Sequence, residues 1–223
     1  MPRIARAIAT GYPHHVTQRG NYRQDVFLDD ADRTLYLSFI QEYSQKNKLA
    51  VLAYCIMSNH VHFIVIPEED TSLSNTFKLA HMRYAKHFNQ KTGYGGGHLW
   101  QGRFYSCVLG QNHLLAAVRY VERNPVRAKL TDKPWLWRWS SCAYNCGEVS
   151  ESLITLTGLS GYLAGSAFDW QAYVDSADYE LFTNGLKRST MTGRPMGAPD
   201  FVADVEKKLD RRLHALKRGR PLK

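Results

Sequence analysis

The chain has 223 residues, of which 44% are hydrophobic and 22% are charged, and its formal net charge is +9. These proportions are typical of a soluble globular protein with one sizeable domain and room for an extension. No apolar run is long enough to span a membrane, and the basic N-terminus is too short and interrupted for a secretion signal. We therefore predict a cytoplasmic protein with no membrane partner.

The four cysteines are scattered, at Cys55, Cys107, Cys142 and Cys146. Only the last two are close in sequence, and no second cysteine pair matches them, so a structural zinc site is not expected. Reduced, buried thiols are the simplest interpretation, and they agree with a cytoplasmic location.

The positive charge is concentrated at the C-terminal end. Residues 185–223 hold eleven Lys or Arg and four Asp or Glu, or +7, which leaves +2 of the total +9 for the first 184 residues. A basic tail on a nearly balanced domain indicates a polyanionic partner. Nucleic acid is favoured over a membrane surface, because the tail lacks the aromatic face of an interfacial helix.

The first half of the chain alternates apolar strands with one amphipathic helix. Residues 14–20 form the first predicted strand, and the aspartate-rich stretch 29–32 supplies the N-cap and first turn of a helix that ends near residue 46. Residues 49–57 form a second strand, and a tight Ser-Asn turn leads into a third at 60–66. These last two strands should pair as an antiparallel hairpin.

A second helix begins near Ser72 and ends before the glycine-rich loop at 93–97. A strand over 98–109 and a third helix over 112–123 follow, and Pro125 ends or kinks that helix. The order strand, helix, strand, strand, helix, strand, helix predicts an α+β fold, in which helices pack on an antiparallel sheet.

The remaining sequence gives weaker signals. Trp135, Trp137 and Trp139 alternate in a stretch that we expect to be extended and to close the edge of the core. Small helices and loops are expected from residue 147 to 185, and then an amphipathic helix over 200–216. The basic tail that follows ends in Lys217-Arg218-Gly219-Arg220-Pro221-Leu222-Lys223.

Two histidines open the third strand, at His60 and His62. Because side chains alternate along a strand, both imidazoles lie on one face, roughly 6.6 Å apart along the chain. At that spacing they can bind one metal ion together, or they can be two hydrogen-bonded histidines at a strand end. A third ligand is needed to favour the metal.

The third helix carries Tyr120 and Asn124, four residues apart and therefore one above the other on the same side. Taken alone, they would be a half-buried tyrosine and a C-terminal asparagine cap. Their combination with the two histidines raises a second interpretation, in which a phenol, an amide and two imidazoles form one site.

That combination resembles the HUH single-tyrosine transposases, and most closely their REP-associated branch. The residues that carry the resemblance are Pro13-His14-His15-Val16-Thr17-Gln18-Arg19-Gly20-Asn21, Met57-Ser58-Asn59-His60-Val61-His62, Leu99-Trp100-Gln101-Gly102-Arg103-Phe104-Tyr105-Ser106 and Tyr120-Val121-Glu122-Arg123-Asn124-Pro125-Val126-Arg127-Ala128. The resemblance implies a ferredoxin-like catalytic domain over residues 1–146 and a C-terminal extension with short helices and a basic tail over 147–223.

It also implies the roles of the site residues. Tyr120 would be the nucleophile, and His60 and His62 would hold the metal. Asn124 stands where insertion-sequence relatives usually have glutamine, and it would ligate directly or through water. The family context implies Mg²⁺ or Mn²⁺, although two imidazoles and an amide would also permit zinc.

The implied reaction is metal-dependent cleavage and strand transfer of single-stranded DNA at REP-type hairpins, through a covalent 5′-phosphotyrosyl intermediate. The branch implies a monomer rather than a helix-swapped dimer, and the substrate implies association with the nucleoid. Two alternatives stay open: a non-catalytic DNA-binding regulator that retains the fold, and a hydrolase that uses metal-bound water. The predicted DNA contacts are Arg19, Arg83, Lys86, Arg103, Arg119, Arg123, Arg127, Lys217, Arg218 and Arg220.

Overall fold

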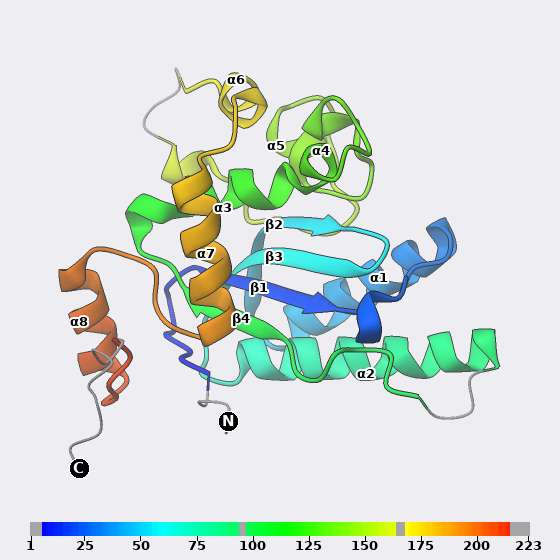
Figure 1. The fold of residues 1–223 in the computed structure, drawn as a ribbon, viewed down its shortest axis with the longest axis horizontal. Helices are drawn as coiled ribbons and strands as arrows, with labels where there is room; N and C mark the ends of the chain where they lie inside the picture. Colours follow the sequence, from blue (N-terminus) through cyan, green and yellow to red (C-terminus); the bar gives the residue numbers. More distant parts are fainter. Residues whose placement is uncertain (1–5, 94–96, 164–167, 215–223) are drawn as a thin grey trace, which may run out of the picture.

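The computed structural model describes residues 6–93, 97–163 and 168–214 (Figure 1). Its first six main elements are β1 (His14–Arg19), α1 (Asp30–Lys46), β2 (Leu49–Ile56), β3 (His60–Pro67), α2 (Ser72–Thr92) and β4 (Tyr105–Val108). They are followed by α3 (Gln111–Glu122), α4 (Asn124–Arg127), α5 (Cys142–Asn145), α6 (Trp170–Asp175), α7 (Glu180–Thr192) and α8 (Pro199–Lys208). Short 3₁₀ turns occur at Asn21–Arg23, Pro134–Leu136 and Ser160–Tyr162.

The four strands form one sheet in the order β2-β3-β1-β4, and all neighbouring strands are antiparallel. Two β-α-β units therefore interleave, which is the ferredoxin-like topology, and the predicted α+β class is confirmed. The expected hairpin is also present, with Ile56 opposite Val61. In the centre of the sheet Thr17 lies opposite His62 and Arg19 opposite His60, which places the two histidines beside β1.

The alternation of side chains divides the core into two layers. Val16, Phe63 and Val65 point to one face and pack with residues of α1 and α2. Ile64 and Cys107 point to the other face and pack with residues of α3 and of α7, which crosses the sheet beside β4 (Figure 1). The imidazoles of His60 and His62 lie on this second face, because they are in phase with Ile64.

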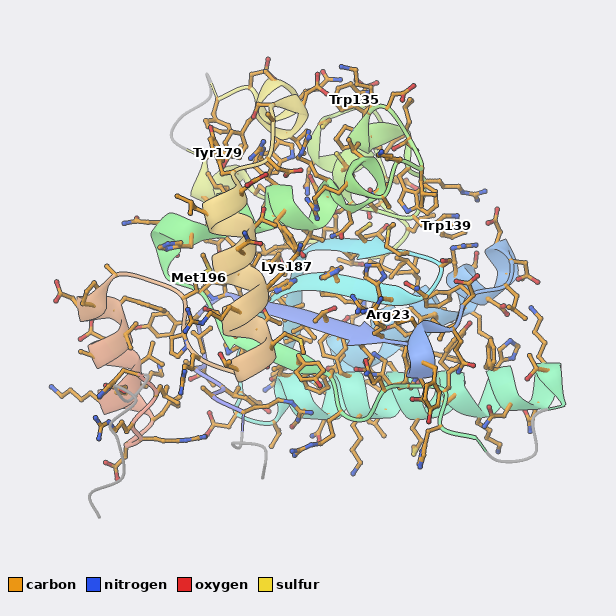
Figure 2. The ribbon with its side chains drawn as sticks, viewed as in Figure 1. Arg23, Trp135, Trp139, Tyr179, Lys187 and Met196 are labelled. Atoms are coloured by element: carbon orange, nitrogen blue, oxygen red, sulfur yellow. The ribbon has the colours of Figure 1, made fainter. Side chains whose placement is uncertain are left out.

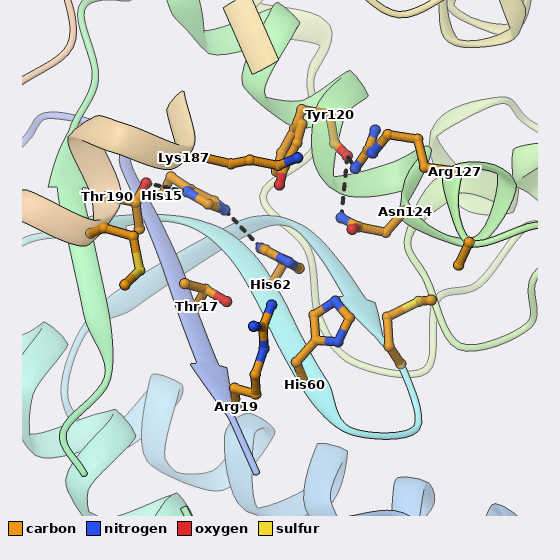
Figure 3. Close-up of a pocket in the computed structure, with 13 residues that line it drawn as sticks. His15, Thr17, Arg19, His60, His62, Tyr120, Asn124, Arg127, Lys187 and Thr190 are labelled. Atoms are coloured by element: carbon orange, nitrogen blue, oxygen red, sulfur yellow. Dashed lines mark hydrogen bonds between the residues drawn. The ribbon is translucent and has the colours of Figure 1, made fainter. Parts of the chain in front are cut away.

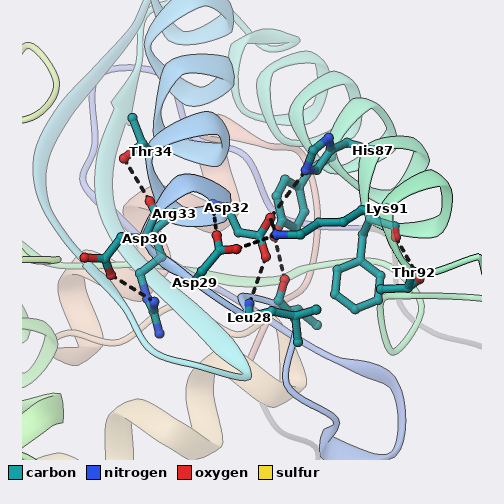
Figure 4. A network of polar contacts seen from close by, with 12 residues as sticks. Leu28, Asp29, Asp30, Asp32, Arg33, Thr34, His87, Lys91 and Thr92 are labelled. Atoms are coloured by element: carbon teal, nitrogen blue, oxygen red, sulfur yellow. Dashed lines mark hydrogen bonds and ion pairs between the residues drawn. The ribbon is translucent and has the colours of Figure 1, made fainter.

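Helix α1 begins as the sequence predicts. The Asp29 side chain accepts a hydrogen bond from the backbone N–H of Asp32, three residues on. The Asp32 carboxylate is 1% exposed and pairs with Lys91 of α2 at 2.7 Å (Figure 4). Its second oxygen accepts the N–H of Leu28 at 2.9 Å. One buried carboxylate thus fixes the start of α1 and its distance from α2.

A second buried carboxylate, that of Glu122, ties α3 to later segments of the chain. It is fully buried, and burial raises its pKa while the surrounding hydrogen bonds oppose that shift. Its donors are Ser141 Oγ at 2.6 Å, Asn145 Nδ2 at 2.6 Å and Trp170 Nε1 at 3.0 Å. These three hydrogen bonds therefore hold the end of α3, where Tyr120 lies, in place.

The tryptophan-rich stretch closes the edge of the sheet, as predicted. Trp139 is 5% exposed, its carbonyl accepts the N–H of Ile56, and the Trp137 indole donates to the Ile56 carbonyl (Figure 2). The prediction of a fully extended stretch is wrong, because residues 134–136 form a 3₁₀ turn that starts at Pro134. Proline favours that turn because its fixed φ suits a first helical position.

Two predicted element boundaries are also wrong. The strand expected over 98–109 is shorter, because residues 99–103 bend around Gly102, whose φ is +82°, and only β4 remains. The helix expected over 200–216 ends at Lys208, because Asp210 adopts a left-handed φ of +44°. The third helix ends at Glu122, next to the predicted Arg123, and Pro125 lies in the first turn of α4, a separate short helix that follows directly.

The described helices include none that is both long and apolar enough to cross a membrane. All four cysteines are free thiols, and three of them are buried. The predicted reduced state is therefore the state of this structure, and its assignment to a cellular compartment stays a prediction.

Candidate active site

A pocket of about 620 Å³ opens on the second face of the sheet, where β1 and β3 approach the end of α3 (Figure 3). Residues from five elements line it: β1, β3, α3, α4 and α7. The side chains in the pocket are those of His15, Thr17, Arg19, Met57, His60, His62, Tyr120, Asn124, Arg127, Ala128, Lys187, Thr190 and Met191. The two histidines, the tyrosine and the asparagine singled out in the sequence are therefore brought together.

The two histidines converge on the pocket with perpendicular rings, 5.1 Å between centroids at 87°. The Nδ1 atom of His60 lies 2.6 Å from Asn59 Oδ1, and that of His62 lies 2.9 Å from His15 Nε2. Burial lowers the pKa of His60 to about 4, helped by the charge of Arg19, and it lowers the pKa of His62 well below its ordinary value. Both imidazoles are consequently neutral at neutral pH, the form in which histidine binds metal.

Tyr120 stands over the imidazoles from α3. Its ring is 5.7 Å from that of His62 at 88°, and the hydroxyl points into the pocket, which Lys187 also lines (Figure 3). The Arg127 guanidinium lies 4.1 Å from the centre of the tyrosine ring. Burial raises the pKa of Tyr120, while the charges of Arg127 and Arg19 act in the opposite direction. The two arginines therefore offset part of the cost that burial places on the ionised phenol.

Asn124 lies one turn beyond the tyrosine, in α4, and is 8% exposed. Its Nδ2 donates to the carbonyls of Tyr120 and Val121, at 3.2 and 3.1 Å. The amide nitrogen is thus committed to the helix end, and the amide oxygen is left for the pocket. Its side chain also opposes the lowering of the His60 pKa through a hydrogen bond, which places the amide beside that imidazole.

These donors fit a divalent cation. The Nδ1 atom of each neutral imidazole is engaged, so Nε2 is the nitrogen that could ligate, and Asn124 offers an oxygen from a side chain that is hydrogen-bonded to His60. Within residues 6–93, 97–163 and 168–214, no group of three His, Cys, Asp or Glu side chains could hold a metal. The third ligand here would be the Asn124 oxygen or water.

The predicted cationic contacts separate into three groups. Arg19 and Arg127 line the pocket. Arg119 and Arg123 are 3% and 8% exposed, and their guanidinium groups donate to backbone carbonyls between residues 173 and 177. They therefore hold the end of α6 and the residues that follow it in place, with Nε and one Nη atom of each guanidinium engaged.

The third group lies away from the pocket. Arg83 pairs with Glu42 at 2.6 Å, and Lys86 is exposed; both are on α2, across the sheet from the histidines. Arg103 lines a smaller hollow of about 280 Å³ that is also formed largely by α2. Lys217, Arg218 and Arg220 lie outside the described residues, so their role stays a prediction.

Several pocket residues were not predicted from the sequence. His15 and Thr17 share a strand face with Arg19, so the period-two pattern of β1 was the signal that could have found them. Lys187, Thr190 and Met191 come from α7, at positions i, i+3 and i+4 of one helix face. That spacing shows that they share a face, but nothing in the sequence indicates what the face covers.

Comparison with known proteins assigns the chain to a family. Residues 9–124, just over half of the 223-residue chain, match the family model of IS200-like transposases. The chain belongs to this family. The predicted family is thereby confirmed, and the matched segment ends at Asn124, the last of the four residues singled out in the sequence.

One solved structure has the same fold, and a second is less similar. A REP-associated tyrosine transposase bound to a REP hairpin is 19% identical and superposes with a TM-score of 0.54, over 76% of this chain and 94% of that chain. A candidate transposase of Deinococcus radiodurans R1 is 17% identical, with a TM-score of 0.38, over 58% of this chain and 92% of that chain. Curated proteins include no match to this sequence.

Proposed function

We propose that this IS200-like transposase is a metal-dependent endonuclease and strand transferase for single-stranded DNA, with Tyr120 as its nucleophile. The observation that carries the proposal is the convergence of Tyr120, two neutral imidazoles, an amide and two arginines on one pocket. A tyrosine that only packed in the core would not need a cation over its ring and an open cavity at its hydroxyl. The family membership adds DNA as the material on which such a site works.

The reaction is a transesterification at phosphorus. The phenol loses its proton to solvent, and its oxygen forms a bond to the phosphorus as the bond to the 3′ oxygen breaks. The leaving oxygen takes up a proton and becomes a 3′-hydroxyl, while the 5′ phosphate remains on Tyr120. One phosphate ester replaces another, so the reverse attack by a 3′-hydroxyl can rejoin strands without a nucleotide cofactor.

His60, His62 and Asn124 would hold the divalent cation, for which we propose Mg²⁺ or Mn²⁺. When bound, such an ion would neutralise charge on the scissile phosphate. The chain's own cations assist: Arg127 supports the ionised phenol, and Arg19 provides positive charge at the mouth of the pocket.

The substrate that we propose is a REP-type hairpin with a single-stranded flank. Support comes from the similar fold of a protein solved with such a hairpin, and from the positive charge of this chain. Lys217, Arg218 and Arg220 would add non-specific phosphate contacts. We propose that a monomer acts, in association with the nucleoid.

The test is a denaturing gel of 5′- and 3′-labelled single-stranded REP hairpin DNA, incubated with the protein and Mn²⁺. We expect a protease-sensitive covalent adduct on the fragment downstream of the cut. Tyr120→Phe should abolish the adduct, since it removes only the oxygen, and His62→Ala should reduce it strongly. Met191→Leu, a change of similar volume in the same pocket, is the matched control for packing.

Two other outcomes would replace the proposal. Cleavage that persists in Tyr120→Phe would identify a hydrolase that uses metal-bound water. Binding of several hairpins without cleavage, in either metal, would identify a DNA-binding regulator that retains the fold. Each outcome is read on the same gel beside a native mobility-shift assay.

A further inference from the structure

Two residues outside the predicted ligand set, His15 and Thr190, connect the His62 ring to helix α7. His15 Nε2 is 2.9 Å from His62 Nδ1, and His15 Nδ1 is 2.7 Å from Thr190 Oγ1 (Figure 3). The two imidazole planes are parallel within 8°, with centroids 5.1 Å apart. Together with the short N···N distance, this means that the rings lie edge to edge, as a ring N–H···N hydrogen bond requires.

The direction of each hydrogen bond can be assigned by starting from Thr190 on α7. Thr190 Oγ1 lies 2.8 Å from the carbonyl oxygen of Leu186, which can only accept, so the threonine hydrogen is used there. The threonine oxygen must then accept from His15 Nδ1–H. Its second lone pair is available to accept from the Cys107 thiol, whose Sγ atom lies 3.3 Å from the threonine oxygen.

Thr190, His15 and His62 form a hydrogen-bonded relay, in which the threonine fixes the tautomer of each ring. A neutral imidazole carries one N–H, so His15 with hydrogen on Nδ1 presents a lone pair at Nε2. That lone pair accepts from His62 Nδ1–H, and the free lone pair of His62 is left on Nε2. Both rings are buried, which keeps them neutral. The relay therefore selects the tautomer of His62 that can ligate through Nε2.

The neighbouring histidine reaches the same tautomer by a shorter route. Asn59 Nδ2 donates to the Arg23 carbonyl at 3.1 Å, which turns Asn59 Oδ1 toward His60 Nδ1 at 2.6 Å. His60 thus also keeps its hydrogen on Nδ1 and its lone pair on Nε2. Two independent hydrogen-bond chains therefore engage the Nδ1 atom of both rings.

We propose that Thr190 and His15 are positioning residues that fix the His62 tautomer for metal binding, so that the C-terminal extension completes the metal site. This inference rests on the proposed metal-binding role of His60 and His62. Thr190 lies far beyond residues 9–124, the segment that matches the family model. Helix α7 is thus part of the site's hydrogen-bonded support rather than only a cover over the sheet.

The test uses the full chain, with Thr190→Val to remove the acceptor and Thr190→Ser to restore it. Partners that orient a ligand histidine typically change metal affinity by about 10–100-fold. We therefore expect Mn²⁺ affinity, followed by electron paramagnetic resonance of the free ion, to fall by that factor in Thr190→Val and to recover in Thr190→Ser. Long-range ¹⁵N–¹H spectra of the metal-free protein should show His62 as the Nδ1–H tautomer in wild type and serine variant only.

Thr192→Val is the matched control. Thr192 is on the same helix, and its hydroxyl donates to the carbonyl four residues earlier at 2.8 Å, but it is exposed and outside the pocket. His15→Leu breaks the same relay at its β1 residue. If Thr190→Val does not fold, His15→Leu serves as the test variant in its place. We expect it to give the same loss of affinity and of the single tautomer.

Two results would overturn the inference, and they are distinguishable. Wild-type affinity and tautomer in both Thr190→Val and His15→Leu would refute the relay while the proposed function stands. Absence of Mn²⁺ binding by wild type would refute the metal part of the proposed function, and the relay's purpose with it. The covalent adduct assay with Tyr120→Phe reads the nucleophile separately from both.

Discussion

Arg127 gives the sharpest test of how this pocket activates its tyrosine. Its guanidinium lies 4.1 Å from the centre of the Tyr120 ring, and it donates to the Tyr120 carbonyl at 2.6 Å. Burial raises the pKa of Tyr120, and Arg127 is the largest influence that lowers it. Replacing this cation by leucine should therefore raise the tyrosine pKa and slow cleavage at neutral pH.

The size of the effect follows from distance and pairing. A cation within 4–6 Å shifts the pKa of an acid by roughly 1–3 units. Arg127 also pairs with Asp178 at 3.3 Å, which offsets part of its field, so we take the lower limit of about 1 unit. Below the tyrosine pKa the ionised fraction falls tenfold per unit, so Arg127→Leu should cleave about tenfold more slowly at pH 7.

The assay is single-turnover cleavage of saturating hairpin DNA between pH 6 and pH 9.5. The pKa of His60 is about 4, and those of His15 and His62 are also lowered by burial, so these imidazoles do not titrate in this range. A rise in rate with pH then reports the phenol. In Arg127→Leu that rise should move to higher pH by about one unit, in line with the estimate above.

Two variants control for charge and for general basicity. Arg127→Lys keeps the charge and should shift the profile less than leucine does. Arg138→Leu removes an arginine whose side chain is 69% exposed and lies outside the pocket, and it should leave the profile unchanged. A leucine variant that cleaves as fast as wild type across this range would refute the reasoning, because the cation would then have no effect on the phenol.

Three further predictions concern stability, each read from urea unfolding. Asp32→Ala should cost about 2–3 kcal/mol, because it removes a buried carboxylate that pairs with Lys91 and accepts the N–H of Leu28. Asp30→Ala, exposed on the same helix, should cost under about 0.5 kcal/mol; equal costs would contradict the assigned role. His81 is buried and its pKa is lowered to about 3 against about 6.5 when unfolded, so the unfolded state gains protons as pH falls. Between pH 7 and pH 5 this should remove about 2 kcal/mol, which His81→Gln should recover; an unchanged pH dependence would count against it. Glu122→Ala strands three buried donors and should cost about 3 kcal/mol or more, and a loss below about 1 kcal/mol would show that those donors find other partners.

The fold was predictable because its signals are local. Alternation around His60 and His62, the tight turn before them and the caps at Asp29 each depend on residues within a few positions. Element order then selected an α+β sheet. The errors concern the ends of elements. The strand that contains β4 was predicted too long because Trp100 is apolar, whereas Trp100 is buried in a bend that Gly102 stabilises through its positive φ. Apolar character reports burial, and it does not by itself report extension.

The site was predictable only as far as the family pattern reaches. Tyr120, Asn124, His60 and His62 were identified, and the structure brings them into one pocket. Charge alone gave a poorer account of the arginines, because a sequence does not say which cations have carbonyl partners. Arg119 has its donors taken by the segment before α7, whereas Arg127 reaches the tyrosine ring.

Residues from α7 could not be predicted, and the reason is physical. The helix face of Lys187, Thr190 and Met191 is not apolar enough to indicate a contact with the core, and it is not charged enough to indicate an exposed surface. Its meaning depends on a threonine oxygen meeting an imidazole 175 positions earlier in the chain, at 2.7 Å. Local pattern carries no information on that distance; only the packing of α7 against β4 and β1 sets it. Mutational scans of the C-terminal extension should therefore find metal affinity concentrated at the one buried hydroxyl of this face and absent from its exposed neighbours.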